Sequence, residues 1–533
     1  MEVDCIPYRE TGYFSGLICD YLDQLPALRP FYSRFPALDD FGKQIKEKGK
    51  HYPKAHRKIL FEALSVQYQG IALSKQTKEN LSVLKEENTY TITTGHQLNL
   101  FTGPLYFLYK IISAINLAKA LKKQYPENNF VPVYWMATED HDFEEINYFN
   151  FRGKKLKWNR EDEGAVGRMS TEGLDEVLKA FVQEMGPGKY ARELEQLFRK
   201  AYLEHATLAG ATRFLANELF GSYGLVIVDG DDPGLKELLI PYVEQDLSGH
   251  ITHDQVSGSI SALQEQRKGY KIQVNPRKIN YFYLKDGLRE RLEERNGHYH
   301  VLNTDLNFSR KALLEELKTH PERFSPNVIT RPLYQEVILP NLCYIGGGGE
   351  LAYWLQFKGI FDAFKLPFPV LLIRNSALLV SEKQKNKISR LDLKMEDLFL
   401  KQTSFINKRI RQISNIDIDF SEQKKLLEEQ FKSLHILAGQ TDKSFLGAVK
   451  AQEVKQKKGL DRLEKRLLKA QKRKLRDEVM RIISLQNDLF PGQSLQERQL
   501  NFSEMYLELG EELIPGLLEK LDPLHLEFSL LTY

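Results

Sequence analysis

The stretch TYTITTGHQLNLFTGPLYFLYK, residues 89–110, decides the fold. Its first half is rich in β-formers and predicts a strand, and Thr102-Gly103-Pro104 predicts a helix start with proline in the first turn. The next apolar run, NNFVPVYWMA (128–137), is nearly continuous, as is typical of a strand covered on both faces. Together they predict a right-handed strand–helix–strand crossover. The helix should bury one face, because apolar residues recur at helical spacing at Leu105, Leu108, Ile112 and Ile115.

Two later segments, YGLVIVDGDDPG (223–234) and FPVLLIRNS (368–376), predict further strands of the same sheet. The sheet is interrupted at about 146–222, where YFNFRGKKLKWNR predicts a hairpin followed by helices. It is interrupted again at about 250–335, where KIQVNPRKINYFYLKDG predicts paired strands around Asn275-Pro276. We therefore expect residues 1–377 to form an α/β, Rossmann-like core with a parallel sheet and two inserts.

The chain changes character after residue 377. Apolar residues alternate at three and four positions in 387–415 and again in 455–485, which predicts an antiparallel α-helical coiled coil over 378–487. SNIDIDFS (414–421) should break the first arm, and a register shift at Leu475 resembles a stutter. The basic run KRLLKAQKRKLR is interpreted as a solvated helix face, with contact to RNA as the alternative. Residues 488–533 are predicted to be a tail that packs on the core.

Composition limits the class of protein. The 533 residues exceed what one hydrophobic core usually organises, so at least two structural units are expected. The net charge of +3 gives no general argument for nucleic acid as a partner. Cys5, Cys19 and Cys343 show no paired spacing, and there is no secretory signal and no apolar run long enough to span a membrane. We expect a cytoplasmic protein that binds neither membrane nor nucleic acid.

Polar residues at the ends of the predicted strands mark candidate sites, because ligands of open α/β sheets bind there. At the end of the first strand, Thr93-Thr94-Gly95-His96-Gln97 contains the pattern T-x-G-H, a form of the HIGH-type signature of nucleotidyltransferases, and Asn99 follows as a further candidate binding residue. Glycine allows the backbone to approach a phosphate, and histidine can stabilise developing charge. The alternative interpretation is a structural histidine at a strand end.

The second candidate is WMATEDHDFEEIN, which contains Glu139, Asp140, His141 and Asp142. Such a density of carboxylates and imidazole at a strand end favours a cation or polar-substrate site. The simpler alternative is a helix N-cap followed by acidic first-turn residues.

Two more candidates lie further along the chain. RPLYQEVILPNLCYIGGGGELAYW combines an arginine suited to a carboxylate or phosphate with a glycine turn that could cradle an anion. FPVLLIRNS ends in three polar residues. No lysine-rich partner of the HIGH-type motif follows, which argues against ordinary adenylate chemistry, and Cys343 is interpreted as a buried structural thiol. The predicted binding residues are Arg331, Gly347, Gly348, Glu350, Tyr353, Trp354, Arg374, Asn375 and Ser376.

Taken together, TTGHQLNLFTGPLYFLYK, PVYWMATEDHDFEEIN, RPLYQEVILPNLCYIGGGGELAYW, FPVLLIRNSA and LFPGQSLQER resemble the cysteine-adding enzymes (cysteine ligases) of bacillithiol biosynthesis over essentially the whole chain. The resemblance implies a ligase that joins L-cysteine to the amine of glucosaminyl-malate. It also implies a core related to the HIGH superfamily with two connecting-peptide inserts, and a coiled coil that supports a homodimer. ATP or another nucleotide is the natural activating co-substrate; the need for a metal is left open.

Under this hypothesis, His96 and the backbone of Gly95 stabilise an activated cysteinyl group. Asp140, His141 or Asp142 accepts the amine proton, and Arg331 or Arg374 binds the malate carboxylates. Three rivals remain at this stage: a nucleotidyltransferase acting on another small metabolite, a non-enzymatic coiled-coil scaffold, and a protein that binds tRNA through its basic helix.

Overall fold

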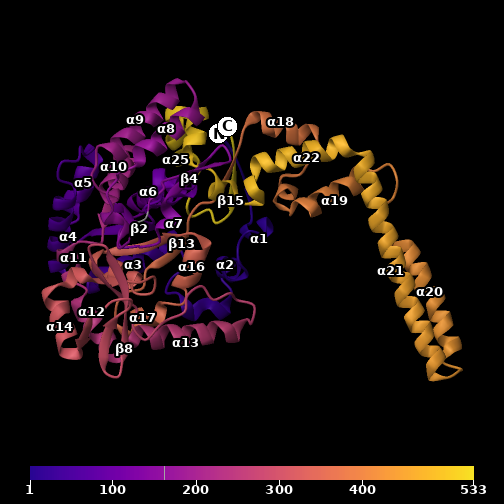
Figure 1. Cartoon of the computed structure of the whole chain (residues 1–533), viewed down its shortest axis with the longest axis horizontal. Helices are drawn as coiled ribbons and strands as arrows, with labels where there is room; N and C mark the ends of the chain where they lie inside the picture. The colour runs from indigo at the N-terminus through magenta and orange to yellow at the C-terminus, as the bar shows by residue number, and fades with distance from the viewer. Residues whose placement is uncertain (161–162) are drawn as a thin grey trace. The chain divides into compact units, whose positions relative to one another are not determined.

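The computed structural model describes residues 1–160 and 163–533. Its internal contacts divide the chain into two units (Figure 1). The first consists of residues 1–379 together with 495–533, and the second of residues 380–494. None of the described helices is both long and apolar enough to cross a lipid bilayer.

The first unit is built on a five-stranded sheet of order β13-β12-β2-β3-β6. Every neighbouring pair is parallel, so the predicted α/β fold with a parallel sheet is confirmed. Sequence analysis missed β12, a short strand directly before the glycine turn. The strands are β2 (Thr89–His96), β3 (Asn129–Met136), β6 (Val226–Asp229), β12 (Asn341–Gly346) and β13 (Val370–Ile373).

Helix α6 (Tyr106–Gln124) packs on this sheet together with α3 (Leu38–His51), as an apolar cluster of both helices with β2, β12 and β13 shows. The helix begins later than predicted, and Pro104 lies before it. The reason is a left-handed turn: Phe101, Thr102 and Gly103 have φ of 47°, 67° and 62°, which an α-helix excludes. The side-chain amide of Asn501 donates to the carbonyls of Phe101 and Gly103, at 2.7 Å each.

The first insert, between β3 and β6, contains the predicted hairpin, β4 (Tyr148–Phe151) and β5 (Lys154–Lys157), followed by helices. The second insert contains the antiparallel sheet β10-β9-β8-β7-β11. The prediction of paired strands around Asn275-Pro276 is wrong: no strand occupies 271–280, and the hairpin turns instead at Asp286-Gly287. The strands are β7 (Tyr281–Lys285), β8 (Leu288–Arg295), β9 (His298–Val301), β10 (Asn307–Ser309) and β11 (Phe324–Pro326).

A small antiparallel sheet brings the two ends of the chain together. Strand β15 (Phe528–Thr532) lies between β1 (Glu2–Ile6) and β14 (Ala377–Val380). The remaining longer helices of this unit are α2 (Gly16–Leu22), α4 (Lys54–Gln67), α5 (Lys75–Val83), α8 (Leu174–Met185), α9 (Lys189–Leu203), α10 (Leu208–Phe220), α12 (Ile240–Gly249), α13 (Ile251–Gln266), α14 (Arg310–Thr319), α15 (Arg331–Ile338), α16 (Gly348–Trp354), α17 (Lys358–Ala363), α24 (Phe502–Leu509) and α25 (Leu513–Lys520).

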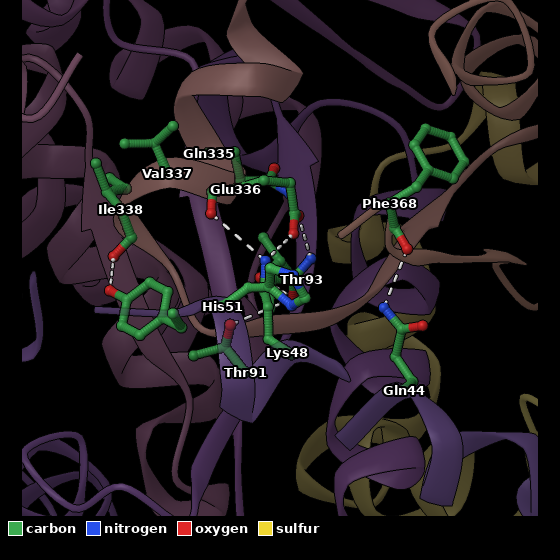
Figure 2. Close-up of polar contacts among 12 residues, drawn as sticks. Gln44, Lys48, His51, Thr91, Thr93, Gln335, Glu336, Val337, Ile338 and Phe368 are labelled. Atoms are coloured by element: carbon green, nitrogen blue, oxygen red, sulfur yellow. Dashed lines mark hydrogen bonds and ion pairs between the residues drawn. The ribbon is translucent and has the colours of Figure 1, made fainter. Parts of the chain in front are cut away.

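A polar network is buried among these apolar elements (Figure 2). The ammonium of Lys48, from α3, lies 2.8 Å from the carboxylate of Glu336, from α15. Asn341, at the start of β12, donates to the same carboxylate at 2.6 Å and accepts hydrogen bonds from Thr91 and Thr93 of β2. All five side chains are buried, so the network fixes α3 and α15 to the sheet through paired rather than solvated charges.

The second unit is helical. Its hairpin consists of α20 (Ser421–Ala438) and α21 (Lys443–Lys474), which pack through Phe431, Ala438 and Val449. The predicted first arm at 387–415 is wrong as a single helix, because α18 (Glu382–Arg390) and α19 (Gln402–Ile413) are separate. The predicted break at 414–421 is confirmed, since no helix spans 414–420. At Leu475, where a register shift was predicted, the helix is interrupted: α21 ends at Lys474 and α22 (Arg476–Leu489) starts after it.

Candidate active site

A cavity of about 750 Å³ opens at the carboxyl ends of β2, β3, β12 and β13. The strand ends supply its floor, and the second insert contributes Arg289 and Arg291 from β8. Arg498, from the C-terminal part of the first unit, also lines it. The cavity therefore lies where ligands of parallel α/β sheets bind.

The structure brings many of the predicted residues into this one cavity, although they come from four separate strand ends. Those that line it are Gly95, His96, Gln97, Glu139, Asp140, His141, Arg331, Gly347, Glu350, Tyr353 and Arg374. Those that do not line it are Thr94, Asn99, Asp142, Gly348, Trp354, Asn375 and Ser376.

Several of the predicted residues outside the cavity instead make buried contacts within the fold. Thr94 donates its hydroxyl to the carbonyl of Ile345 on the neighbouring strand. Trp354 is fully buried, with its ring stacked on Tyr344 at 4.4 Å between centroids. Asn375 contacts Ser113, at 2.8 Å. The prediction that these three side chains line the pocket is therefore wrong, because buried hydrogen bonds and ring packing hold them elsewhere.

His96 is buried at the end of β2 against Tyr106 and Phe107. Burial, reinforced by the charge of Lys110, lowers the pKa of His96 to about 3 from an ordinary 6.5, so its imidazole is neutral. Its Nε2 atom has no hydrogen-bond partner among the described residues. A neutral ring with an unpaired nitrogen accepts a hydrogen bond at neutral pH more readily than it donates one to an anion.

Behind His96 lies a second, much smaller cavity of about 10 Å³. Its walls include other buried polar atoms without a partner among the described residues, namely Asn99 Oδ1, Thr102 Oγ1, Tyr134 Oη and Thr212 Oγ1. The space matches about one water molecule, and its lining offers the several polar contacts that a buried water needs. His96 thus separates the large cavity from a small polar one.

Asp140 and His141 form a polar cluster after β3. Burial opposes ionisation of Asp140, but hydrogen bonds from the His141 backbone N–H (2.8 Å) and the Gln97 amide (3.0 Å), with the charge of Arg289, outweigh it and hold the pKa of this carboxyl well below its ordinary value. Arg289 contacts His141 Nδ1 at 2.6 Å. Because arginine can only donate, Nδ1 accepts and the ring proton lies on Nε2. Asp140 is therefore a permanent anion, and the free lone pair of His141 is already used.

The glycine turn after β12 is bonded to Glu350, in the first turn of the helix α16 that follows it. The carboxylate of Glu350 accepts the backbone N–H of Gly347 (2.9 Å) and the hydroxyl of Tyr344 (2.8 Å), and it pairs with Lys110 at 2.7 Å. Burial alone would raise the pKa of Glu350, but Lys110 and these donors lower it below its ordinary value. The turn therefore presents a paired carboxylate where sequence analysis predicted a free anion cradle.

Two arginines expected to bind carboxylates differ in their partners. Arg374 Nη2 lies 2.7 Å from the buried carboxylate of Glu497, so its charge is already compensated. Arg331 has no carboxylate within ion-pair distance among the described residues. It packs between the rings of Trp135 and Tyr344, donates to Gln335 at 3.0 Å, and leaves Nη2 unpartnered. Arg331 is therefore a cation available to an incoming anion, as is Arg291, whose Nη1 also has no hydrogen-bond partner among the described residues.

Several charged groups of this site were not among the predicted residues, including Lys110, Arg289, Arg291 and Glu497. Lys110 was visible as a lysine within an otherwise apolar helix, and it is 5% exposed. Arg289 and Arg291 stand two residues apart on a strand, which places them on one face. Glu497 offered no local signal, because its partner is 123 residues away in the chain.

The cavity has an excess of positive charge. Among the described residues, its lining contains seven cationic side chains, Lys110, Arg277, Arg289, Arg291, Arg331, Arg374 and Arg498, and three carboxylates, Glu139, Asp140 and Glu350. Glu139 is itself paired with buried Lys236. An anionic ligand would offset this excess of positive charge.

A parallel sheet of this order with a polar, cation-rich cavity at its carboxyl edge defines a Rossmann-like protein whose site suits a small anionic ligand. The chain belongs to the bacillithiol biosynthesis BshC family: residues 1–375 match its N-terminal Rossmann-like domain and residues 377–533 its C-terminal coiled-coil domain.

Relatives resemble the chain over its full length. A protein of Christiangramia forsetii is 59% identical and one of Flavobacterium johnsoniae is 58% identical. A more distant one from Cytophaga hutchinsonii is 36% identical. In each case the match covers 100% of this chain and at least 99% of the relative, and all three have the name "Putative cysteine ligase BshC".

Proposed function

We propose that this chain is a ligase that forms an amide bond between L-cysteine and the amine of glucosaminyl-malate in bacillithiol biosynthesis. The family and the names of its relatives support a cysteine ligase over a general nucleotidyltransferase. The observation that carries the proposal is Arg331, an uncompensated guanidinium in a cavity already rich in positive charge. Glucosaminyl-malate has two carboxylates, which suit such a wall.

Arg331 binds one malate carboxylate through its unpartnered Nη2. The guanidinium carbon of Arg331 lies 5.8 Å from the ring centroid of Trp135 and 5.6 Å from that of Tyr344, and these contacts restrict the side chain, so little freedom is lost when the anion binds. Arg289 and Arg291 are suited to the second carboxylate or to phosphate groups. Arg374 has a lesser role, because Glu497 already occupies its other face.

Amide formation from a free carboxylate in water needs activation, and we propose ATP or another nucleoside triphosphate as the co-substrate that supplies it. The excess of cationic side chains in the cavity is consistent with phosphate binding. The reaction joins the cysteine carbonyl carbon to the amine nitrogen. The bond from this carbon to one carboxylate oxygen breaks, and that oxygen leaves on the phosphate group that activated it.

The amine must lose a proton during this reaction. Asp142 lies outside the cavity, and the His141 lone pair is engaged by Arg289. Asp140 is an ionised carboxylate in the cavity wall, and we assign it to orient the amine. Its low pKa makes it a weak base, so proton transfer to it occurs late, once the new C–N bond has made the nitrogen acidic. Neutral His96 accepts a hydrogen bond beside the Gly95 backbone.

The test is an assay of the purified chain with glucosaminyl-malate, L-cysteine and ATP, with bacillithiol measured by mass spectrometry. We expect product that depends on all three substrates and is strongly reduced in Arg331→Met at low glucosaminyl-malate concentration, whereas Arg295→Met, an exposed arginine outside the cavity, should retain activity. A deletion strain should accumulate glucosaminyl-malate. Wild-type protein that yields no product with any nucleoside triphosphate, together with normal bacillithiol in the deletion strain, would refute the proposal.

We also propose that the chain acts as a cytoplasmic homodimer assembled through the hairpin α20–α21. The hairpin leaves large apolar side chains exposed, among them Ile436 (70% exposed), Leu426, Leu437 and Phe445. Such residues on a helical hairpin are suited to a second copy. Light scattering should give the mass of two chains for the wild type and of one for Ile436→Asp. An unchanged mass would exclude this surface as the interface.

A further inference from the structure

Three side chains capable of binding a metal ion lie together where the two ends of the chain meet, outside the cavity described above. Cys5 lies on β1, and His525 and Glu527 lie just before β15. The thiol sulfur of Cys5 is 3.4 Å from His525 Nδ1. The carboxylate of Glu527 is 3.4 Å from His525 Nε2. Within residues 1–160 and 163–533, this is the one group of three or more such donors close enough to share an ion.

Strand pairing creates this group from residues 520 positions apart. In the antiparallel pair β1–β15, Cys5 lies opposite Ser529 and Ile6 opposite Phe528. The segment that leads into β15 therefore passes beside Cys5. The His525 and Glu527 side chains are 53% and 36% exposed, so an ion can reach them from solvent. The fold thus fixes the backbone of the site and leaves the side chains free to adjust.

We propose that Cys5, His525 and Glu527 form a binding site for a thiophilic divalent cation of the zinc class. Sulfur, imidazole nitrogen and carboxylate oxygen are the donors that zinc takes, whereas magnesium and calcium prefer oxygen alone. Bonds of about 2.3 Å to sulfur and about 2.0 Å to nitrogen, at a tetrahedral angle, place the two donors about 3.5 Å apart. The observed separation of 3.4 Å between Cys5 sulfur and His525 Nδ1 matches this distance.

The ion binds on the Nδ1 side of His525, towards which the sulfur already points. Glu527 then turns from Nε2 to the ion, a small movement because one donor atom of each residue lies within 4.8 Å of the others. The thiol proton leaves to solvent as the sulfur–metal bond forms, so each ion bound releases one proton. Three protein donors leave a fourth position for water. The site would fasten the N-terminal strand to the C-terminal one.

Cobalt(II) is the probe, because a cobalt–thiolate bond has a charge-transfer band in the near ultraviolet. We expect the full-length, reduced and chelator-treated chain to bind one equivalent with this band. Cys5→Ser should abolish the band, and His525→Ala and Glu527→Gln should weaken binding by more than about tenfold. The matched controls Cys19→Ala and His253→Ala change a thiol and an imidazole outside the group, and both should bind cobalt like the wild type.

Thermal unfolding with zinc gives an independent measurement. Zinc should raise the Tm of the wild type and of Cys19→Ala, and should leave that of Cys5→Ser unchanged, because only an intact site couples binding to folding. The metal-free Tm of Cys5→Ser shows whether this variant folds. Absence of the charge-transfer band in the wild type, or its persistence in Cys5→Ser, would overturn the proposal.

Discussion

Lys48 and Glu336 form an ion pair 2.8 Å long that is almost completely removed from solvent, with side-chain exposures of 2% and 0%. The pair connects to the cavity through one residue. Gln335 donates to the Glu336 carboxylate at 3.1 Å and accepts from Arg331 at 3.0 Å. Figure 2 shows Gln335 and Glu336 beside Lys48. Arg331, which lines the cavity, is thus connected through Gln335 to an ion pair in the core.

Removing one partner of this pair should be strongly destabilising. In Lys48→Met, the carboxylate of Glu336 is left buried with only amide donors, and the free energy of unfolding should fall by about 3–5 kcal/mol. Denaturant unfolding measures this. The control is Lys43→Met, which removes an exposed lysine paired with Asp40 and should change stability by less than about 1 kcal/mol. The double variant Lys48→Met/Glu336→Gln should be more stable than the two single effects added together, because neither charge then remains unpaired. Additive effects would contradict the coupling.

Arg331 should govern affinity for the anionic substrate. In Arg331→Met we expect the KM for glucosaminyl-malate to rise by about tenfold to a hundredfold, the range for losing a hydrogen-bonded ion pair, with the KM for cysteine unchanged. Gln335→Leu should shift the same KM by less, because it frees the guanidinium without removing it. Steady-state kinetics with each substrate varied in turn measures both. Equal increases in both KM values would instead indicate a general loss of structure.

Protonation of His96 should make stability depend on pH. Its folded pKa of about 3 lies below the unfolded value near 6.5, so the unfolded chain binds the proton first. The contribution of His96 is fully present above about pH 6.5 and is lost as the pH falls towards 3, by about 1.4 kcal/mol per pH unit within that window. Unfolding free energies at pH 7.5, 6.0 and 5.0 should therefore converge for wild type and His96→Asn as the pH falls. Parallel curves would show that the pKa of His96 is not lowered in the folded state.

Asn501 should stabilise the left-handed turn before α6. Asn501→Ala removes donors to the carbonyls of Phe101 and Gly103, which lie in a buried loop, and should cost about 1–3 kcal/mol of stability. Hydrogen exchange should show faster exchange of the amides of residues 99–105. Asn303→Ala, at an exposed turn of the second insert, is the control and should leave these amides protected.

Regular repetition made much of the fold predictable. The β-formers of β2 and the apolar run in β3 are local patterns, and so is the break at 414–421. The start of α6 was not predictable, because the turn at Phe101–Gly103 depends on Asn501, about 400 residues away. The predicted pairing of 387–415 with 455–485 is confirmed for α19, whose Ile406 and Ile410 pack against Leu467 and Val479, whereas α20 as the hairpin partner of α21 was not predicted.

The candidate site was also predictable from the sequence only in part. Strand-end polarity located Gly95, His96 and Asp140, because a parallel sheet gathers such residues at one edge. Arg331 was located by its residue type, since it lies at the start of α15. Trp354 could not be placed from sequence, since a helical aromatic residue looks the same whether it faces a pocket or the core. The sequence also did not show that Arg374 is paired with a carboxylate and Arg331 is not, because this difference depends on Glu497.

The C-terminal residues 495–533 belong to the first unit, and among them Arg498 lines the cavity, Glu497 neutralises Arg374, and Asn501 shapes the turn that follows His96. A ribosome synthesises these residues after the parallel sheet and both inserts. A nascent chain can form its sheet early, yet its cavity stays incomplete until Glu497, Arg498 and Asn501 have emerged. Premature termination between residues 380 and 496 should therefore release a chain with a folded sheet and no working site, so the second unit is synthesised before the site is complete.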